Sequence, residues 1–349
     1  MSIFLNKKIL IYGSGKSGLS TLRFLRNKSE VFLHDDFKKN STKLTSRRSI
    51  IKNQFDFIII SPGIDINKCK LSWFLKKNLH KIYTDLDVFY SFYRNDCISI
   101  TGTNGKSTTC RLLYEILLKH NYDVKLVGNI GRPILSVKDV KSKTIFVVEA
   151  SSYQLEYSKI FKPKYAAILN ISPDHLERHK TINNYVRAKF KILNNDSKNS
   201  LGFINEKDLL TMKELSKIKI KKKILKISTR SLGNVQKKIN NEYFLDEANK
   251  ENLSFIIAIS NKLKLKKKIV FETLKEFKGL KYRQQIIYKN KILTIINDSK
   301  STTFSSSISI LKKRLNIYWL LGGIPKKGDK FALHKKYHSN IRAFIYGKN

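Results

Sequence analysis

Short apolar runs of strand length alternate with amphipathic helical stretches along the whole chain. The runs lie at residues 7–13, 30–35, 55–61, 97–102, 122–128, 144–151, 165–172, 291–298, 317–323 and 343–347. Continuous apolar runs of this kind, separated by helix-length segments, are typical of parallel sheets that are covered by helices on both faces. The sequence therefore predicts an α/β fold.

The length of the chain indicates more than one domain. Its 349 residues exceed a single ordinary core, because domains average roughly 150 residues. The apolar runs form three series that join near Arg94 and Tyr282. We therefore predict domains at residues 1–94, 95–281 and 282–349.

The chain is strongly basic. It carries 69 lysine and arginine residues against 27 aspartate and glutamate residues, a formal net charge of +42. Such a charge would normally indicate a nucleic acid or an acidic membrane surface as partner. The lysines are spread along the whole chain, however, and the densest run, 213–228, alternates basic with apolar residues like an exposed strand face or a solvated helix. We interpret the charge as a compositional bias and expect no nucleic-acid partner, with a dedicated nucleic-acid surface as the alternative.

The cysteines and the lengths of the apolar stretches indicate in which cellular compartment the protein works. Cys69, Cys97 and Cys110 form no CxxC pair, so we expect buried thiols in a reducing compartment. No apolar stretch approaches the roughly 20 residues that span a bilayer, and the apolar run at the N-terminus is too short for a signal peptide. We expect a cytoplasmic monomer without a membrane partner.

The first glycine-rich turn, residues 13–18, has the pattern GxGxxG and follows a predicted strand. Asp35 and Asp36 lie about 20 residues further on, as in a dinucleotide-binding fingerprint. The underlying contacts are less selective, because glycines and a helix N-terminus suit any diphosphate and an acidic residue suits any ribose or base donor. A UDP-sugar fits as well as NAD, and a tight turn without a ligand is the remaining alternative.

A second turn, ITGTNGKSTT at residues 100–109, carries the stronger signal. A Walker A loop needs a glycine five positions before Gly105, and that position is Ile100, so the general pattern fails. The chemistry of the shorter loop is intact: successive N–H groups can bind an anion, Lys106 can reach the outer phosphates, and Ser107 can bind Mg²⁺. The turn therefore predicts a nucleotide phosphate site.

The longer string TGTNGKST, residues 101–108, resembles the ATP loop of the Mur ligase family, whose members add amino acids to the peptidoglycan precursor. The segment VGNIGRP with Asn129 resembles another family motif, and VVEASSYQLE, residues 147–156, is similar to the segment of the D-glutamate-adding members. The resemblance implies three domains: a Rossmann-like N-terminal domain, a central P-loop ATPase-like domain with a parallel sheet, and a Rossmann-like C-terminal domain, here incomplete.

Two further motifs imply a metal-assisted reaction. NISPDHLERH, residues 170–179, resembles the family's histidine motif, and YVRAK, residues 185–189, its lysine motif. A lone loop histidine is usually structural and a helix lysine usually solvated, but the resemblance favours functional roles. It implies two Mg²⁺ sites and a carbamylated Lys189. The implied metal ligands are Ser107, Glu149, His175 and Lys189, and the implied catalytic residues are Lys106, His175, Lys189 and Arg283.

The resemblance also assigns residues to each substrate. Those implied at ATP are Gly102, Thr103, Asn104, Gly105, Lys106, Ser107, Thr108, Asn129, Asn252, Arg283 and Asp298. Those implied at the UDP-linked substrate are Ser14, Lys16, Ser17, Asp35, Ser61, Gly63, Asn129, Ser151 and Gln154. Those implied at D-glutamate are Ser299, Lys300, Thr302 and Lys326. The segment around Asn252 departs from the family pattern at Asp246 and Ala248, and Tyr282 replaces the usual histidine, so these matches are weaker.

The implied activity is the ATP-dependent ligation of D-glutamate to UDP-N-acetylmuramoyl-L-alanine through an acyl phosphate, with two small molecules as partners. The chain stops at Asn349, where the family's third domain continues. We therefore expect it to bind the UDP-linked substrate but to ligate poorly or not at all, with ATP binding left open. The alternatives are a sister ligase or a folate-polyglutamylating relative, a remnant that only binds nucleotide, a NAD-dependent enzyme and a nucleic-acid binder.

Overall fold

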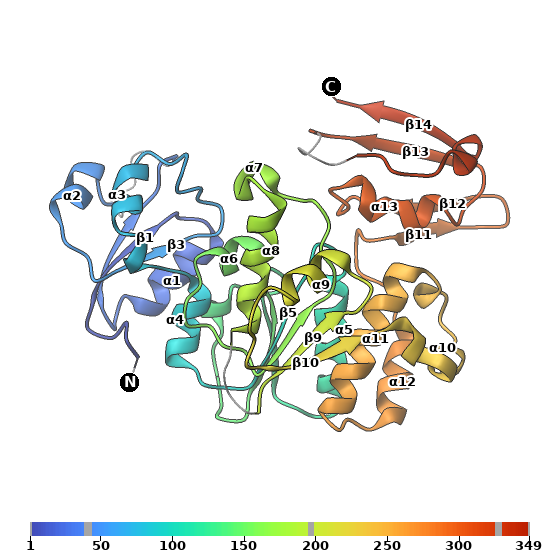
Figure 1. Cartoon of the computed structure of the whole chain (residues 1–349), viewed down its shortest axis with the longest axis horizontal. Coiled ribbons are helices and arrows are strands. Elements are labelled where there is room, and N and C mark those ends of the chain that lie inside the picture. The colour runs from blue at the N-terminus through green and yellow to red at the C-terminus, as the bar shows by residue number, and fades with distance from the viewer. Residues whose placement is uncertain (1, 38–43, 195–198, 325–329, 348–349) are drawn as a thin grey trace.

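The computed structural model describes residues 2–37, 44–194, 199–324 and 330–347. Its elements form a first unit (residues 2–94), a central unit (95–281) and a third unit (282–347). Figure 1 shows the first unit at the left of the central unit and the third unit at the upper right, above α11 and α12. Parallel sheets with helices on their faces confirm the predicted α/β class.

The first unit contains a four-stranded parallel sheet in the order β2-β1-β3-β4. Its strands are β1 (Lys8–Tyr12), β2 (Glu30–His34), β3 (Phe57–Ile60) and β4 (Ile82–Tyr83). Its helices are α1 (Lys16–Leu25), α2 (Arg47–Lys52), α3 (Ser72–Lys77) and α4 (Asp85–Phe92). Gly18 is required where α1 leaves β1, because a Cβ there would lie 1.8 Å from the Gly13 carbonyl oxygen. The helix can therefore approach the strand end closely.

The central unit contains a six-stranded parallel sheet in the order β10-β9-β8-β5-β7-β6. Its strands are β5 (Cys97–Thr101), β6 (Val124–Gly128), β7 (Ile145–Glu149), β8 (Tyr165–Ile168), β9 (Leu201–Asn205) and β10 (Lys223–Ile227). Its helices are α5 (Lys106–Lys119), α6 (Ser152–Glu156), α7 (Leu176–His179), α8 (Ile182–Phe190), α9 (Leu209–Leu215), α10 (Gly233–Ile239), α11 (Glu247–Lys262) and α12 (Lys267–Glu276). Every side chain of β5 is buried, which explains its continuous apolar run.

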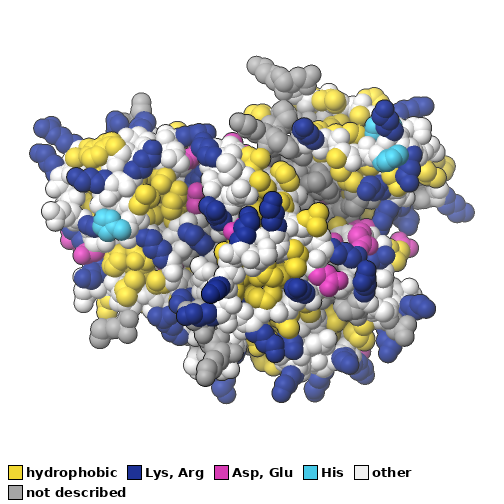
Figure 2. All heavy atoms as spheres, viewed as in Figure 1, with side chains coloured by type: hydrophobic (Ala, Val, Ile, Leu, Met, Phe, Trp, Pro, Cys, Tyr) yellow, Lys and Arg dark blue, Asp and Glu magenta, His cyan; other side chains and the backbone are white. Residues whose placement is uncertain are grey.

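The most basic run of the sequence forms the end of α9 and the edge strand β10. Lys223 and Lys226 on β10 are exposed while Ile227 is buried. Lysines on an edge strand oppose pairing with another chain, so this charge has a structural use. Elsewhere, Figure 2 shows lysine and arginine side chains scattered over the face in view. Within the described ranges, no helix combines the length and apolar character needed to cross a membrane.

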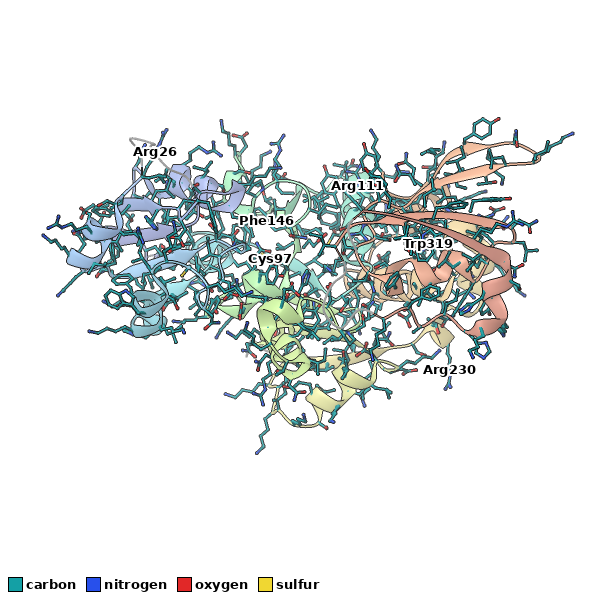
Figure 3. The ribbon with its side chains drawn as sticks, turned by 90° about the horizontal axis from the view of Figure 1, so that it is seen from above. Arg26, Cys97, Arg111, Phe146, Arg230 and Trp319 are labelled. Atoms are coloured by element: carbon teal, nitrogen blue, oxygen red, sulfur yellow. The ribbon has the colours of Figure 1, made fainter. Side chains whose placement is uncertain are left out.

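The first and central units share a hydrophobic core. Phe89 of α4 and Phe146 of β7 pack edge to face with ring centroids 4.7 Å apart, and Tyr93 lies against both rings. Figure 3 shows Phe146 and Cys97 in the middle of the molecule, between the two units. A second core lies on the other face of the central sheet, under α5, α11 and α12. One face of the central sheet therefore packs against the first unit, and the other face packs against α5, α11 and α12.

The third unit contains two small sheets. β11 (Gln285–Lys289) and β12 (Thr294–Asn297) pair antiparallel, whereas β13 (Ile317–Gly322) and β14 (Ile341–Tyr346) pair parallel. α13 (Phe304–Leu311) places Phe304 against Trp319, which is labelled in Figure 3. Leu320 is 80% exposed, so the other face of β13 is open in this unit. Short 3₁₀ turns lie at Leu79–Lys81, Ile134–Ser136, Lys191–Leu193, Thr229–Leu232, Glu242–Phe244 and Lys335–Asn340.

Candidate active site

The predicted site residues of the central unit meet at the carboxyl ends of β5, β7 and β8. Ile100 pairs with Glu149, and Thr101 pairs with Ile168, so the segments that follow these three strands leave the sheet at one edge. This edge is where open α/β sheets bind ligands. In Figure 1, α7 stands above this edge, between the first and third units.

The phosphate loop, residues 101–108, is held in shape by its neighbours. Asn104 donates its N–H to the Asn170 side-chain oxygen (2.8 Å) and accepts at its own carbonyl from the Asn170 amide (3.3 Å). Gly105 precedes α5 with φ of +81°, and a Cβ there would lie 2.0 Å from Asn252 Oδ1. A glycine is therefore needed both for the backbone conformation and for the close approach of α11. Asn252 therefore lies beside the phosphate loop, and its role at ATP stays a prediction.

Two buried lysines share one acceptor at this loop. Lys106 Nζ donates to the carbonyls of Gly102 (2.8 Å) and Thr103 (2.7 Å), and Lys189 Nζ donates to the same Gly102 carbonyl (2.7 Å). Burial lowers the pKa of Lys106. Burial, and next the charge of Lys106, hold the pKa of Lys189 well below its usual range. An anion bound beside these two buried amines would stabilise their charged forms.

Glu149 provides a buried carboxylate at the end of β7. It is 1% exposed and accepts from Ser107 Oγ at 2.8 Å and from Asn129 Nδ2 at 2.7 Å. A carboxylate and a hydroxyl oxygen in contact are suitable Mg²⁺ ligands. The described residues contain no group of three or more histidine, cysteine, aspartate or glutamate side chains that could hold a metal. The structure thus brings Ser107 and Glu149 together, and the two-metal assignment stays a prediction.

His175 lies at the start of α7 in a left-handed backbone conformation, with φ of +56°. Its Nδ1 is 2.9 Å from the Tyr153 hydroxyl, and its Nε2 is 3.3 Å from Asp174 Oδ2. A non-glycine residue in this region of φ and ψ is uncommon and is often found at functional sites. Tyr153 and Asp174 thus fix the plane of the imidazole, a role that their positions in the quoted motifs did not reveal.

The third unit reaches the phosphate loop through Ser306 and Arg283. Ser306 Oγ donates to Asn104 Oδ1 at 3.0 Å. Arg283 is close enough that its charge helps to lower the pKa of Lys106, after the larger effect of burial. The Arg283 Nε–H is buried and has no hydrogen-bond partner among the described residues. An unsatisfied guanidinium donor near Lys106 is available to an anion, as the predicted role at a nucleotide phosphate requires.

The predicted diphosphate end of the first unit is only partly open to a ligand. Ser14 donates its N–H and its hydroxyl to Asp35 Oδ2, both at 2.7 Å, whereas Lys16 and Gly63 are exposed. Ser61 donates to the Gly13 carbonyl at 2.9 Å and supports the glycine turn. The second acidic residue, Asp36, is buried against Tyr12, His34 and Lys70. Asp36 therefore has a structural role, and these contacts leave Asp35 as the candidate at the strand end.

The comparisons with known proteins agree with this geometry. Residues 100–270 match the family model described as the Mur ligase middle domain. A UDP-N-acetylmuramoylalanine–D-glutamate ligase of Rickettsia felis is 34% identical over 376 residues, which cover 100% of this chain and 83% of the relative. The chain belongs to the Mur ligase family. A relative of the same name from Buchnera aphidicola subsp. Schizaphis graminum is also 34% identical, with 98% of this chain and 83% of the relative covered.

Solved Mur ligases share the fold at low sequence identity. The MurF ligase of Thermotoga maritima in complex with ADP superimposes with a TM-score of 0.56 at 15% identity and covers 98% of this chain. The UDP-N-acetylmuramate-alanine ligase MurC of the same organism gives a TM-score of 0.55 at 17% identity and covers 97%. The chain covers 82% and 85% of these two structures. The predicted Mur ligase fold is therefore confirmed.

In this Mur ligase the third-unit residues predicted at the substrates differ in exposure and in hydrogen bonding. Asp298 accepts from the Gln284 N–H (3.0 Å) and from the hydroxyls of Ser301 (2.6 Å) and Ser307 (3.2 Å), so it also holds the turn after β12. The remaining predicted residues with described positions are exposed: Ser299, Lys300 and Thr302. Lys326 lies outside the described residues. Ser299 donates its N–H to Asn297 Oδ1 at 3.0 Å, and Lys300 donates its N–H to the Tyr282 carbonyl at 3.0 Å, so their backbones belong to the turn after β12.

His179 of this Mur ligase is expected to make stability depend on pH. Burial lowers its pKa from 6.5 to about 4, and its Nε2 contacts Ser152 Oγ at 3.0 Å. Between these values the unfolded chain binds a proton that the folded chain does not, so the free energy of unfolding falls as the pH drops, by at most about 1.4 kcal/mol per pH unit. His179→Gln removes this titration. Urea midpoints at pH 7 and pH 5 should therefore differ less in the variant than in the wild type.

The control for this prediction is His80→Gln on the surface, which should keep the wild-type response to pH. An unchanged difference between the two pH values in His179→Gln would show that His179 is not the group responsible.

Proposed function

We propose that this Mur ligase joins the amine of D-glutamate to the carboxylate of UDP-N-acetylmuramoyl-L-alanine with the use of ATP, as a cytoplasmic step of peptidoglycan synthesis. The observation that carries the proposal is the convergence of Lys106 and Lys189 on the Gly102 carbonyl, beside the buried carboxylate of Glu149. The segment that follows Glu149 is the one that resembles D-glutamate-adding members. The names of the 34% identical relatives support the same choice of amino acid.

ATP binding is supported by the phosphate loop. The loop stands at the N-terminus of the 14-residue helix α5, where backbone N–H groups and the helix dipole favour anions. Lys106 lies within the loop, and Arg283 brings a free N–H donor from the third unit. These groups would offset the charge on the outer phosphates and hold them in line with the attacking carboxylate.

The residues present fit Mg²⁺ at one position and a carbamate at another. Ser107 and Glu149 supply neutral and anionic oxygen ligands in contact. When bound, Mg²⁺ supplies positive charge that stabilises the phosphate oxygens in the transition state. Lys189, whose pKa is lowered by burial, is inclined to the neutral amine that reacts with CO₂. The product would be a carbamate with anionic oxygens, and His175 would be its partner in a second metal site.

The reaction has two chemical steps. An oxygen of the substrate carboxylate attacks the γ-phosphorus of ATP, the bond to the bridging oxygen breaks, and ADP leaves from an acyl phosphate. The neutral amine of D-glutamate then attacks the acyl carbon, a proton leaves the nitrogen, and inorganic phosphate departs as the amide forms. Lys106 and Arg283 counter the repulsion between carboxylate and triphosphate in the first step, and that repulsion is the main barrier to bringing the reactants together.

The test is phosphate release from ATP in the presence of UDP-N-acetylmuramoyl-L-alanine and one amino acid at a time. D-glutamate should stimulate release, and amide formation should be seen with D-[¹⁴C]glutamate, whereas L-glutamate, meso-diaminopimelate and L-alanine should have little effect. Stimulation by a different amino acid with its own UDP precursor would identify a sister ligase instead.

A further inference from the structure

We propose that Asp85 is a positioning residue for the UDP-linked substrate, because it holds Ser17 of the first unit and Gln154 of the central unit in one arrangement. The inference rests on the proposed function and extends it to a residue that touches no reacting atom. Ser17 of the first unit and Gln154 of the central unit were both predicted at this substrate. Asp85 is the group that connects them.

The contacts of Asp85 come from both units. It is the first residue of α4 and is 3% exposed. Gln154 Nε2 donates to Oδ1 at 3.2 Å and to Oδ2 at 3.3 Å, and the Leu86 N–H donates to Oδ1 at 3.0 Å. The Ser17 hydroxyl lies beside the carboxylate and acts to lower its pKa. These donors from described residues are all neutral. A carboxylate held this way is costly to bury, and burial raises its pKa accordingly.

The arrangement determines what Ser17 and Gln154 can offer to a ligand. A serine hydroxyl has one proton, and the Ser17 hydroxyl lies beside the Asp85 carboxylate, whose pKa it acts to lower. Ser17 can therefore meet a diphosphate through its backbone N–H, at the start of α1, rather than through its hydroxyl. The structure thus changes the chemistry expected of this predicted residue.

Hydrogen bonds to both the NH₂ group and the oxygen of the Gln154 side-chain amide fix its orientation. Its NH₂ group faces Asp85, so its Oε1 faces Ser151, from which it accepts the N–H at 3.2 Å and the hydroxyl at 3.1 Å. Ser151 follows Glu149 by two residues and was itself predicted at the substrate. Hydrogen bonds thus run from Asp85 at the start of α4 through Gln154 to Ser151, two residues beyond the end of β7, and Ser17 of the glycine turn lies beside Asp85. Loss of Asp85 would therefore remove the group that faces both Ser17 and Gln154.

Asp87 is a matched control on the same helix. It is also buried, and its Oδ1 accepts from Ser158 Oγ (2.9 Å) and from the N–H groups of Lys159 (2.9 Å) and Ile160 (2.8 Å). Its Oδ2 accepts from Thr84. Asp87 therefore ties the same two units together without contacting a predicted substrate residue. A purely structural role would be shared by Asp85 and Asp87.

The experiment compares Asp85→Asn with Asp87→Asn in the full chain. Asparagine keeps the shape but turns one acceptor into a donor, so it must lose the bond from Ser17 or from Gln154. Asp85→Asn should raise the Kd for UDP-N-acetylmuramoyl-L-alanine, measured by calorimetry, about tenfold, and leave the Kd for ATP within about twofold. Asp87→Asn should lower the melting temperature and leave the Kd for the UDP-linked substrate near the wild-type value. Ser17→Ala should raise the Kd for the UDP-linked substrate less in the Asp85→Asn background than it does in the wild-type chain.

The outcomes separate the two proposals. If the wild type binds the UDP-linked substrate but Asp85→Asn leaves the Kd unchanged, the positioning role of Asp85 is overturned. Equal changes of the Kd in Asp85→Asn and Asp87→Asn would overturn it too. Neither result bears on the proposed function. Substrate binding with the predicted difference but no D-glutamate-dependent phosphate release would overturn the proposed function and leave the positioning role supported. No binding of this substrate by the wild type would overturn both.

Discussion

Replacing Lys106 by methionine is expected to lower ATP-dependent ligation of D-glutamate by at least about a hundredfold, as loss of one preorganised charge donor commonly does. Lys106 Nζ lies against the carbonyls of Gly102 and Thr103, inside the loop that precedes α5. Methionine fills similar space, so the loop should keep its packing while the charge is lost. The KM for ATP should rise and kcat should fall, because the ammonium acts on phosphate charge in both the ground state and the transition state.

The matched control for Lys106 is Lys16→Met, because Gly15-Lys16-Ser17 and Gly105-Lys106-Ser107 are the same tripeptide before a helix. Lys16 is exposed in the first unit and was predicted at the UDP-linked substrate. Its loss should raise the KM for that substrate and leave the KM for ATP unchanged. Initial rates measured over both substrate concentrations would check this. An ATP effect of equal size in both variants would mean that the phosphate loop has been assigned to the wrong turn.

The sequence alone predicted the strands with continuous apolar runs and the nucleotide phosphate loop at residues 100–109. β5 and β7 were predictable because both are buried on both faces and end at the phosphate loop and Glu149. β9 and β10 were not identified as strands. β10 carries Lys223 and Lys226 on an exposed edge, so its sequence fits a solvated helix as well as a strand. The spacing of apolar residues cannot distinguish a helix from a strand where one face of the segment is exposed to solvent.

Individual roles within the site depend on contacts that no spacing encodes. Asp35 and Asp36 are adjacent and chemically identical, yet only Asp36 is buried with Tyr12 and His34. The shared carbonyl of Gly102 likewise joins two lysines 83 positions apart, 189 − 106 in the numbering of the chain. Such pairs arise from the order of strands in the sheet, which sets which loops meet. The resemblance to a family located the residues, whereas the fold shows what each of them contacts.

The second large effect is expected at Lys189, where Lys189→Arg should reduce ligation at least about a hundredfold. Lys189 is 1% exposed, and burial together with Lys106 lowers its pKa well below the usual range. A lowered pKa increases the neutral amine at a given pH, and that form reacts with CO₂ to give a carbamate and a proton. Formation of the carbamate should therefore increase as the pH rises and reverse as it falls. Arginine keeps a cation but cannot react in this way.

The measurement is ¹³C NMR of the protein in ¹³C-bicarbonate, beside activity in buffer freed of CO₂. The control is Lys222→Arg, because Lys222 is also buried, bonds only to the Pro163 carbonyl among described partners (3.0 Å), and has its pKa lowered to about 7 by burial. If Lys189 carries the carbamate, its signal disappears in Lys189→Arg and persists in Lys222→Arg, and activity falls when CO₂ is removed. A signal lost only in Lys222→Arg would show that burial alone selects the reactive lysine. In that case Lys189 would act as a cation next to Lys106, and its replacement by arginine should then be tolerated.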